Sequence, residues 1–143
     1  MRRILLASHG KLASGLKSSV DVLAGDSSAI TAVDAYVDDS DYTKPIQRFI
    51  QESGPGDESV IFTDILGGSV FQKVALLRPE DHGVIHVTGM NLAAVMECLL
   101  TPDRLTPANV DEITRMAAQQ LKRVSVPKGE ETGGSEDGFF SSA

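Results

Sequence analysis

Apolar and polar positions alternate along the chain in blocks that predict strands and helices in turn. Short apolar runs, which predict strands, lie at residues 4–7, 30–37, 60–62 and 84–88. The segments between them carry apolar residues three or four positions apart, the spacing that puts side chains on one face of a helix. Continuous apolar character in a short run is typical of strands buried on both sides of a parallel sheet. The pattern therefore predicts an α/β domain, with a mainly parallel sheet and helices on both of its faces.

The first two predicted helices have recognisable ends as well as apolar faces. The first spans residues 11–24, Gly25 follows it as a C-cap, and its expected apolar face consists of Leu12, Leu16, Val20 and Leu23. The second has Pro45 in its first turn, where a missing N–H is tolerated, and its apolar face consists of Ile46, Phe49 and Ile50.

Three later helices are predicted mainly from their first residues. Ser69 is the expected N-cap of a helix that reaches Leu77, and Asn91 opens a helix that runs through Leu100. Thr106 caps a further helix, with proline at its first position, and the apolar residues of that helix are Val110, Ile113, Ala117 and Leu121. Short polar side chains are preferred at these positions because they accept hydrogen bonds from the free N–H groups of a first turn.

The composition changes near the C-terminus. Residues 123–126 are a candidate for a short final strand, and glycine, serine and acidic residues predominate from Pro127 onward. Such a segment buries too little apolar area to offset the entropy lost on ordering it. We therefore expect one folded domain over residues 1–126 and a disordered acidic, Gly/Ser-rich tail over residues 127–143.

Composition and charge restrict the possible classes of function. The chain has 143 residues, 41% of them hydrophobic and 23% charged, which is ordinary for one soluble globular domain. Its net charge of −7 argues against nucleic acid or an anionic membrane as a partner. No apolar run approaches the roughly 20 residues that span a bilayer, so we expect no direct membrane insertion. Cys98 is the one cysteine, which excludes an internal disulfide and favours a cytoplasmic location.

The histidines do not indicate a metal centre. His9, His82 and His86 are accompanied by no C-x-x-C or H-E-x-x-H motif. We expect no metal, and we interpret His82 and His86 as structural residues.

Two segments that follow apolar strands carry the candidate chemistry. His9 follows the first strand, and the sequence T-D-I-L-G-G-S at residues 63–69 follows the third and supplies Asp64. The carboxyl ends of parallel strands meet at one edge of a sheet, where ligands bind in open α/β folds. We therefore expect the imidazole of His9 and the carboxylate of Asp64 to lie close together.

Three short motifs give the chain a resemblance to a known family. They are S-H-G at residues 8–10, T-D-I-L-G-G-S at 63–69 and G-M-N-L at 89–92. In this order and spacing they resemble the IIA component of the mannose family in the bacterial sugar phosphotransferase system, over about residues 3–126. The resemblance implies a doubly wound sandwich with four parallel strands in the order 2-1-3-4. It also implies a homodimer whose subunits exchange an antiparallel C-terminal strand, and residues 123–126 match the place of that strand.

The resemblance also implies a function and roles for site residues. His9 matches the histidine that accepts a phosphoryl group from the phosphocarrier protein HPr and passes it to a histidine of a IIB component. The IIB component phosphorylates the sugar while the membrane components IIC and IID carry it into the cell. Asp64 matches the carboxylate that holds the histidine ring, and the turn that meets the phosphoryl oxygens matches Gly67, Gly68 and Ser69. The family's chemistry is that of a phosphotransferase without a cofactor.

The residue types fit this chemistry. A nucleophilic histidine needs one unprotonated ring nitrogen, and a carboxylate on the other nitrogen fixes that tautomer and offsets the positive charge that develops on the ring. We assign Nδ1–H to Asp64 and phosphorylation to Nε2. Backbone N–H groups at a Gly-Gly turn that opens a helix suit phosphoryl oxygens. The alternative for Gly67, Gly68 and Ser69 is a purely structural turn and helix cap.

Several alternative hypotheses about the function remain open. Val70 stands where many family members have proline, a departure that we expect to leave the chemistry intact. Domains of this type also act as a phosphotransferase subunit for dihydroxyacetone kinase or as regulatory phosphorylation modules in transcription activators. A phosphoaspartate at Asp64 would instead indicate a receiver-like switch. Flavin binding has little support, because we expect the loops at this edge to lack aromatic residues. The sequence does not identify the sugar or the IIB partner.

Overall fold

A parallel sheet of four strands lies at the centre of the fold, in the order β2-β1-β3-β4. The computed structural model describes residues 1–128. The strands are β1 (Arg2–His9), β2 (Ile30–Ala35), β3 (Glu58–Thr63) and β4 (Val84–Thr88). All three pairings between neighbouring strands are parallel, which confirms the predicted α/β class and strand order.

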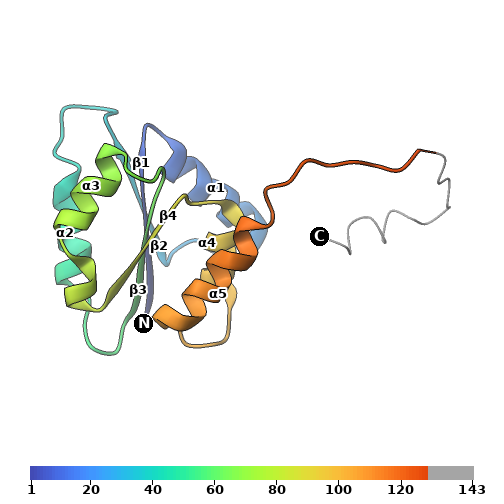
Figure 1. Cartoon of the computed structure of the whole chain (residues 1–143). Coiled ribbons are helices and arrows are strands. Elements are labelled where there is room, and N and C mark those ends of the chain that lie inside the picture. The colour runs from blue at the N-terminus through green and yellow to red at the C-terminus, as the bar shows by residue number, and fades with distance from the viewer. Residues whose placement is uncertain (129–143) are drawn as a thin grey trace.

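Helices cover both faces of this sheet, as Figure 1 shows. One face is covered by α1 (Leu12–Ala24), α4 (Leu92–Leu100) and α5 (Pro107–Ala118), and the other by α2 (Thr43–Gln51) and α3 (Ser69–Leu76). A 3-10 helix, η1 (Pro79–His82), leads into β4.

Each face of the sheet has its own hydrophobic core. Ile4 and Leu6 of β1 lie in the core beneath α1, α4 and α5, whereas Leu5 and Ala7 lie in the core beneath α2 and α3. All four side chains are fully buried. Successive side chains of a strand point to opposite faces, so a strand between two helical layers needs an unbroken apolar run.

Some predicted helix faces and ends were wrong in detail. The buried face of α1 is formed by Ala13, Leu16 and Val20, whereas Leu12 and Leu23 at the edge of that face are 51% and 62% exposed. The apolar spacing cannot tell the centre of a helix face from its edge. α5 ends at Ala118, so Leu121 lies outside it and is exposed.

The cap of α3 and the end of β2 also differ from the prediction. Gly68, in an extended conformation, is the N-cap of α3, and Ser69 is its first helical residue. β2 ends at Ala35, because Tyr36 adopts a φ of +66°, which no strand residue can keep. The N-caps Asn91 and Thr106 and the C-cap Gly25 are confirmed.

The C-terminal strand does not form within one chain. Within the described residues 1–128, the segment 123–126 belongs to no strand and the sheet keeps four members. β4 therefore has β3 on one side and a free edge on the other. A strand exchanged between two chains stays a prediction, and most of the predicted tail, residues 129–143, lies outside the described residues.

Candidate functional site

The end of β1 and the residue after β3 bring the predicted imidazole and carboxylate together. Because β1 and β3 are neighbours in the sheet, His9 and Asp64 reach the same edge. Oδ2 of Asp64 accepts the backbone N–H of His9 at 2.8 Å and also lies 2.8 Å from Nδ1 of the His9 ring. The predicted juxtaposition is therefore confirmed.

Asp64 is held firmly and stays ionised. Its second oxygen, Oδ1, accepts the backbone N–H of Ile65 at 2.9 Å. Burial alone would raise the pKa of Asp64, but the N–H groups of His9 and Ile65 and the His9 ring outweigh it, so the pKa lies below its usual value. An ionised carboxylate can only accept hydrogen bonds, so the proton of the imidazole resides on Nδ1.

The other ring nitrogen faces the start of α3. Nε2 of His9 lies 3.0 Å from the hydroxyl oxygen of Ser69. With its proton on Nδ1, the ring presents a lone pair at Nε2, which accepts the hydrogen bond of the Ser69 hydroxyl. The His9 side chain is 41% exposed, whereas that of Asp64 is 10% exposed. The carboxylate is therefore largely buried, and the imidazole is accessible from solvent.

The Gly-Gly turn brings the N-terminus of α3 onto the imidazole. Gly67 has a φ of +79°, which favours glycine, and a β-carbon on Gly68 would lie 2.7 Å from Cγ2 of Ile65 and 3.4 Å from Cε1 of His9. The side-chain amide of Gln72 donates to the carbonyl of Gly67 at 2.8 Å and holds the turn closed. Gly68 provides no side-chain cap, so the first N–H groups of α3 are left without an intrahelical acceptor beside Nε2.

Two tyrosines belong to the site and were missed from the sequence. The ring of Tyr36 stacks on His9 with 5.4 Å between ring centroids and 28° between planes. Its hydroxyl lies 2.8 Å from Oγ of Ser69 and 3.2 Å from the hydroxyl of Tyr42. The expectation that loops at this edge lack aromatic residues was therefore wrong. Tyr36 follows Ala35, the register partner of His9, so the strand pairing would have located it.

Other residues singled out from the sequence lie outside the site. Thr63 lies 2.9 Å from both Nε2 of His86 and the hydroxyl of Thr88, so it is a buried strand-end residue. Burial lowers the pKa of His86, which suits a neutral structural role. The side-chain oxygen of Asn91 caps α4 by accepting the N–H of Ala94 at 2.8 Å, so Asn91 has a structural role.

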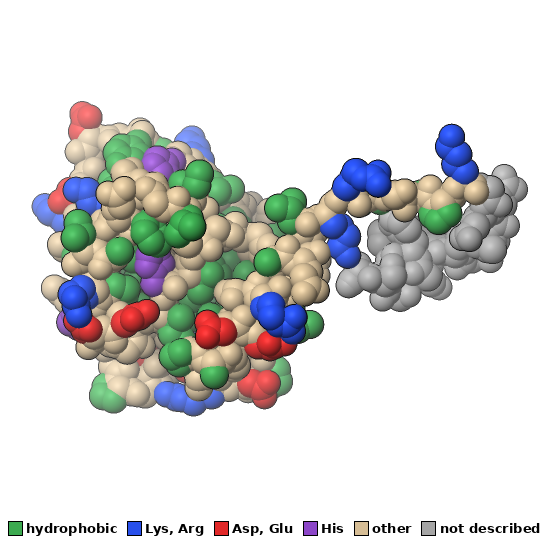
Figure 2. Space-filling model, in the orientation of Figure 1, with side chains coloured by type: hydrophobic (Ala, Val, Ile, Leu, Met, Phe, Trp, Pro, Cys, Tyr) green, Lys and Arg blue, Asp and Glu red, His purple; other side chains and the backbone are tan. Residues whose placement is uncertain are grey.

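Exposed apolar side chains surround the site. In Figure 2, hydrophobic side chains gather around a histidine at the end of the molecule where β1 and β3 finish. The exposed apolar residues next in sequence to the site are Leu12, Tyr36, Val37, Ile65 and Leu66, and we call this set the apolar collar. Within this collar, Ile65 is 60% exposed and Leu66 is 73% exposed.

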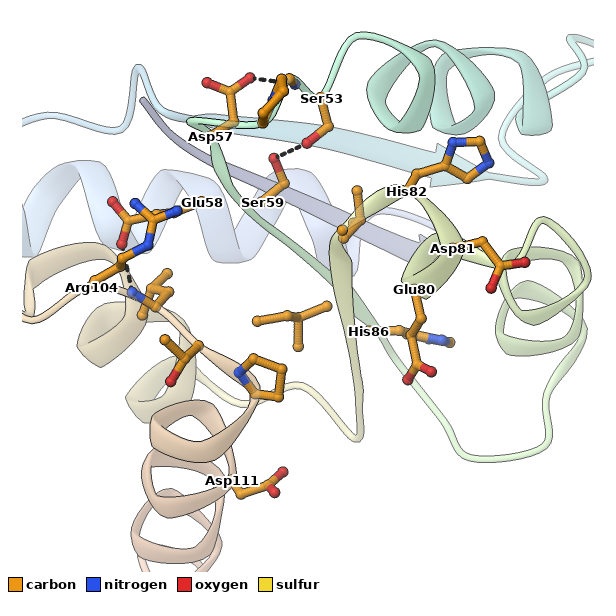
Figure 3. A pocket seen from close by; sticks show the side chains of 18 residues that line it. Ser53, Asp57, Glu58, Ser59, Glu80, Asp81, His82, His86, Arg104 and Asp111 are labelled. Carbon is orange, nitrogen blue, oxygen red and sulfur yellow. Dashed lines mark hydrogen bonds between the residues drawn. The ribbon is translucent and has the colours of Figure 1, made fainter.

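A separate groove lies at the opposite end of the sheet. It has a volume of about 810 Å³ and runs beside β4 (Figure 3). Its lining includes carboxylates of β3, η1 and α5, and it includes neither His9 nor Asp64. Within residues 1–128 no three His, Cys, Asp or Glu side chains gather as a metal ion would require. None of the described helices is long and apolar enough to cross a bilayer.

Comparisons with known proteins agree with the fold and indicate a family. The family described as "PTS system fructose IIA component" matches residues 3–118. A structure from Klebsiella pneumoniae, described as a phosphoenolpyruvate-dependent sugar phosphotransferase system permease, is 27% identical with a TM-score of 0.75, over 85% of this chain and 90% of that one. A IIA protein associated with the fucose utilization operon of Streptococcus pneumoniae is 26% identical with a TM-score of 0.68, over 85% and 92% of the two chains. The mannose/sorbose-specific IIA subunit of Enterococcus faecalis is 21% identical with a TM-score of 0.71, over 89% and 97%, and supports the fold alone.

Proposed function

The chain belongs to the fructose/mannose-type IIA family of the sugar phosphotransferase system, and from that premise we propose that it carries a phosphoryl group on Nε2 of His9. The group would come from phospho-HPr and pass to a histidine of a IIB component. The observation that supports this most directly is the pair of contacts on the His9 ring, with Asp64 on Nδ1 and a hydroxyl on Nε2.

The transfer needs no proton movement on His9. The lone pair of Nε2 attacks the phosphorus atom, and the bond from phosphorus to the donor breaks with its electron pair returning to the donor. The His9 ring keeps its proton on Nδ1 and gains positive charge, which the carboxylate of Asp64 offsets at 2.8 Å. When the acceptor attacks, the P–Nε2 bond breaks, its electron pair returns to Nε2, and the neutral imidazole is restored.

The start of α3 is the proposed cradle for the phosphoryl oxygens. Ser69 offers a hydroxyl, and the free N–H groups of the first turn lie at the positive end of the helix dipole. Gly67 and Gly68 allow this backbone to approach the imidazole closely. Donors placed where charge is spread over the phosphoryl oxygens lower the barrier without covalent chemistry of their own.

The apolar collar is the proposed docking surface for both protein partners. HPr and IIB would have to reach the same nitrogen in turn, so each encounter must be brief. Transient interfaces of this kind are small, below about 1,200 Å² in total. Exposed side chains such as Ile65 and Leu66 supply apolar contact area within such a patch.

Radiolabelled phosphoenolpyruvate with enzyme I and HPr tests the proposal. We expect label on the wild-type chain that is labile in acid and stable in base, and none on a His9→Ala variant. Base-labile label that depends on Asp64 would contradict it. Onward transfer to a IIB protein separates the transport role from a purely regulatory one, which would stop at phospho-His9.

The homodimer is a second part of this proposal. The free edge of β4, bordered by the groove of Figure 3, is where residues 123–126 of another chain would add an antiparallel strand. Deleting the chain from Arg123 onward should convert a dimer into monomers in sedimentation experiments. An unchanged, stable dimer would reject strand exchange.

A further inference from the structure

Three hydroxyl groups form a continuous hydrogen-bonded chain that ends on His9. The hydroxyl of Tyr42 lies 3.2 Å from that of Tyr36, which lies 2.8 Å from Oγ of Ser69, and Oγ lies 3.0 Å from Nε2 of His9. The three residues come from the N-cap of α2, the residue after β2 and the first turn of α3. Three separate segments therefore converge on one lone pair.

The carboxylate on the far side of the ring sets the direction of this chain. Because Asp64 takes the proton of Nδ1, Nε2 can only accept, and the Ser69 hydroxyl must donate to it. The oxygen of Ser69 is then free to accept the proton of Tyr36, whose oxygen in turn accepts that of Tyr42. Burial and the hydrogen bond to Tyr36 raise the pKa of Tyr42 to about 12, so the outermost group stays protonated and remains a donor.

The backbone of Tyr36 is strained in a way that burial does not explain. Tyr36 and Arg78 are the non-glycine residues with positive φ in the described part of the chain, and that of Tyr36 is +66°. Such a conformation is costly for a residue with a large side chain, and it persists where its surroundings require it. Tyr36 is 59% exposed, so burial of its side chain offsets little of the free energy that this backbone conformation costs. What the conformation achieves is the stack on His9 and the contact with Ser69.

We propose that Tyr36, braced by Tyr42, is a positioning residue for phosphoryl transfer and acts through Ser69. This inference rests on the proposed phosphorylation of His9. In the resting protein the chain keeps the Ser69 hydroxyl aimed at Nε2. When the P–Nε2 bond forms, the Ser69 proton turns to a phosphoryl oxygen, while the Tyr36 hydroxyl still occupies the oxygen of Ser69 and prevents it from rotating away.

A double-mutant cycle measures this coupling. Rapid-quench transfer from phospho-HPr is compared for the wild type, Tyr36→Phe, Ser69→Ala and the double variant. Tyr36→Phe keeps the ring and its stack, and we expect transfer to slow about fivefold, the value of one hydrogen bond between uncharged groups. In the Ser69→Ala background the same change should have no further effect. With excess donor, all four proteins should still reach full labelling of His9.

The matched control removes a hydroxyl from the same loop. Ser40 contacts Asp38 and takes no part in the hydroxyl chain, so Ser40→Ala should transfer at the wild-type rate. Tyr42→Phe should slow transfer less than Tyr36→Phe, because it removes the brace and leaves the contact with Ser69.

A second measurement does not depend on phosphorylation. In the unphosphorylated protein, the 15N resonance of His9 Nε2 should move in Tyr36→Phe toward its position in Ser69→Ala. If the wild type takes no phosphate, the proposed function fails while this spectrum still tests the hydroxyl chain. A Tyr36→Phe protein with the wild-type rate and the wild-type Nε2 resonance would overturn the inference. An equal slowing by Tyr36→Phe with and without Ser69 would also overturn it.

Discussion

At each of their two ends, strands β1 and β3 bring a carboxylate against a basic side chain. At the amino ends, Arg2 and Glu58 are register partners whose charged atoms lie 3.0 Å apart. Arg2 also donates to the carbonyls of Thr101 and Asp103, and Glu58 accepts the N–H of Leu105. Both members of this pair therefore hydrogen-bond to backbone groups, and these bonds hold the connection between α4 and α5 against the sheet.

At the carboxyl ends, the pair of His9 and Asp64 has a different distribution of contacts. Asp64 is fixed by backbone N–H groups, as Glu58 is, but its partner is a half-exposed imidazole ring with a second nitrogen beyond the pair. Within residues 1–128, the hydrogen-bonding partner of that nitrogen is the hydroxyl of Ser69. The His9–Asp64 pair therefore anchors its carboxylate and leaves a nitrogen of its imidazole accessible, whereas both members of the Arg2–Glu58 pair are held by backbone groups.

The largest expected effect is that of Asp64→Asn on transfer. An asparagine amide can donate to Nδ1, which drives the ring proton to Nε2 and removes the nucleophilic lone pair. We expect transfer from phospho-HPr to slow by about a hundredfold or more, as for other histidines whose orienting carboxylate is neutralised. Rapid-quench kinetics on protein shown to be folded by circular dichroism measures this. A rate within a factor of about two of the wild type would show that Asp64 has no chemical role.

Glu58→Ala should have the opposite profile. It removes the carboxylate that faces the Arg2 guanidinium and the acceptor of the Leu105 N–H, which we expect to lower the free energy of unfolding by about 2 kcal/mol, or roughly 6 °C in melting temperature. Transfer at a temperature where the variant is folded should be unchanged. Calorimetry measures the melting temperature, and the same kinetic assay measures the transfer rate. Glu58→Gln is a milder control, because its side chain keeps a hydrogen-bond acceptor. Slower transfer with an unchanged melting temperature would reverse the roles assigned to the two ends.

Most of the fold was predictable because a buried parallel sheet leaves a strong pattern. The apolar runs of β1 and β3 and the caps Asn91 and Thr106 are local signals, and all were recognised. His9 and Asp64 were predictable as well, because both follow buried strands of a parallel sheet. Tyr36 was not recognised, because its position depends on an unusual φ and on the register between β1 and β2. The exposure of Leu12 likewise depends on how α1 is rotated on the sheet.

Low pH should lower the free energy of unfolding, because it weakens the carboxylate contacts at both ends of β1 and β3. The N–H of Leu105 and then Arg2 lower the pKa of Glu58, and the pKa of Asp64 is lowered as well. A carboxyl group whose pKa is lower in the folded chain contributes stability that is complete above its unfolded value, about 4, and is lost as the pH falls through its folded value. Urea unfolding near pH 6 and near pH 3 should show this loss in the wild type. The loss should be smaller in Glu58→Gln and in Asp64→Asn; a loss equal to that of the wild type in both variants would contradict the account.

The smallest expected effect concerns the two strained residues. Asn tolerates positive φ, so Tyr36→Asn relieves the backbone strain, and we expect at most a small rise in the free energy of unfolding. Arg78→Asn, at a φ of +51° before η1, is the matched control and should stabilise by a similar amount. Only Tyr36→Asn should slow phosphoryl transfer. If both variants transfer at the wild-type rate, the strain at Tyr36 serves no function.

The most direct test of the central claim is to identify the phosphorylated atom. NMR of the phosphorylated chain with 15N-labelled histidine detects which ring nitrogen is coupled to phosphorus. The geometry predicts coupling to Nε2 of His9, with Nδ1 still protonated and facing Asp64. Phosphorus bonded to Nδ1, to another histidine or to the carboxylate of Asp64 would contradict it.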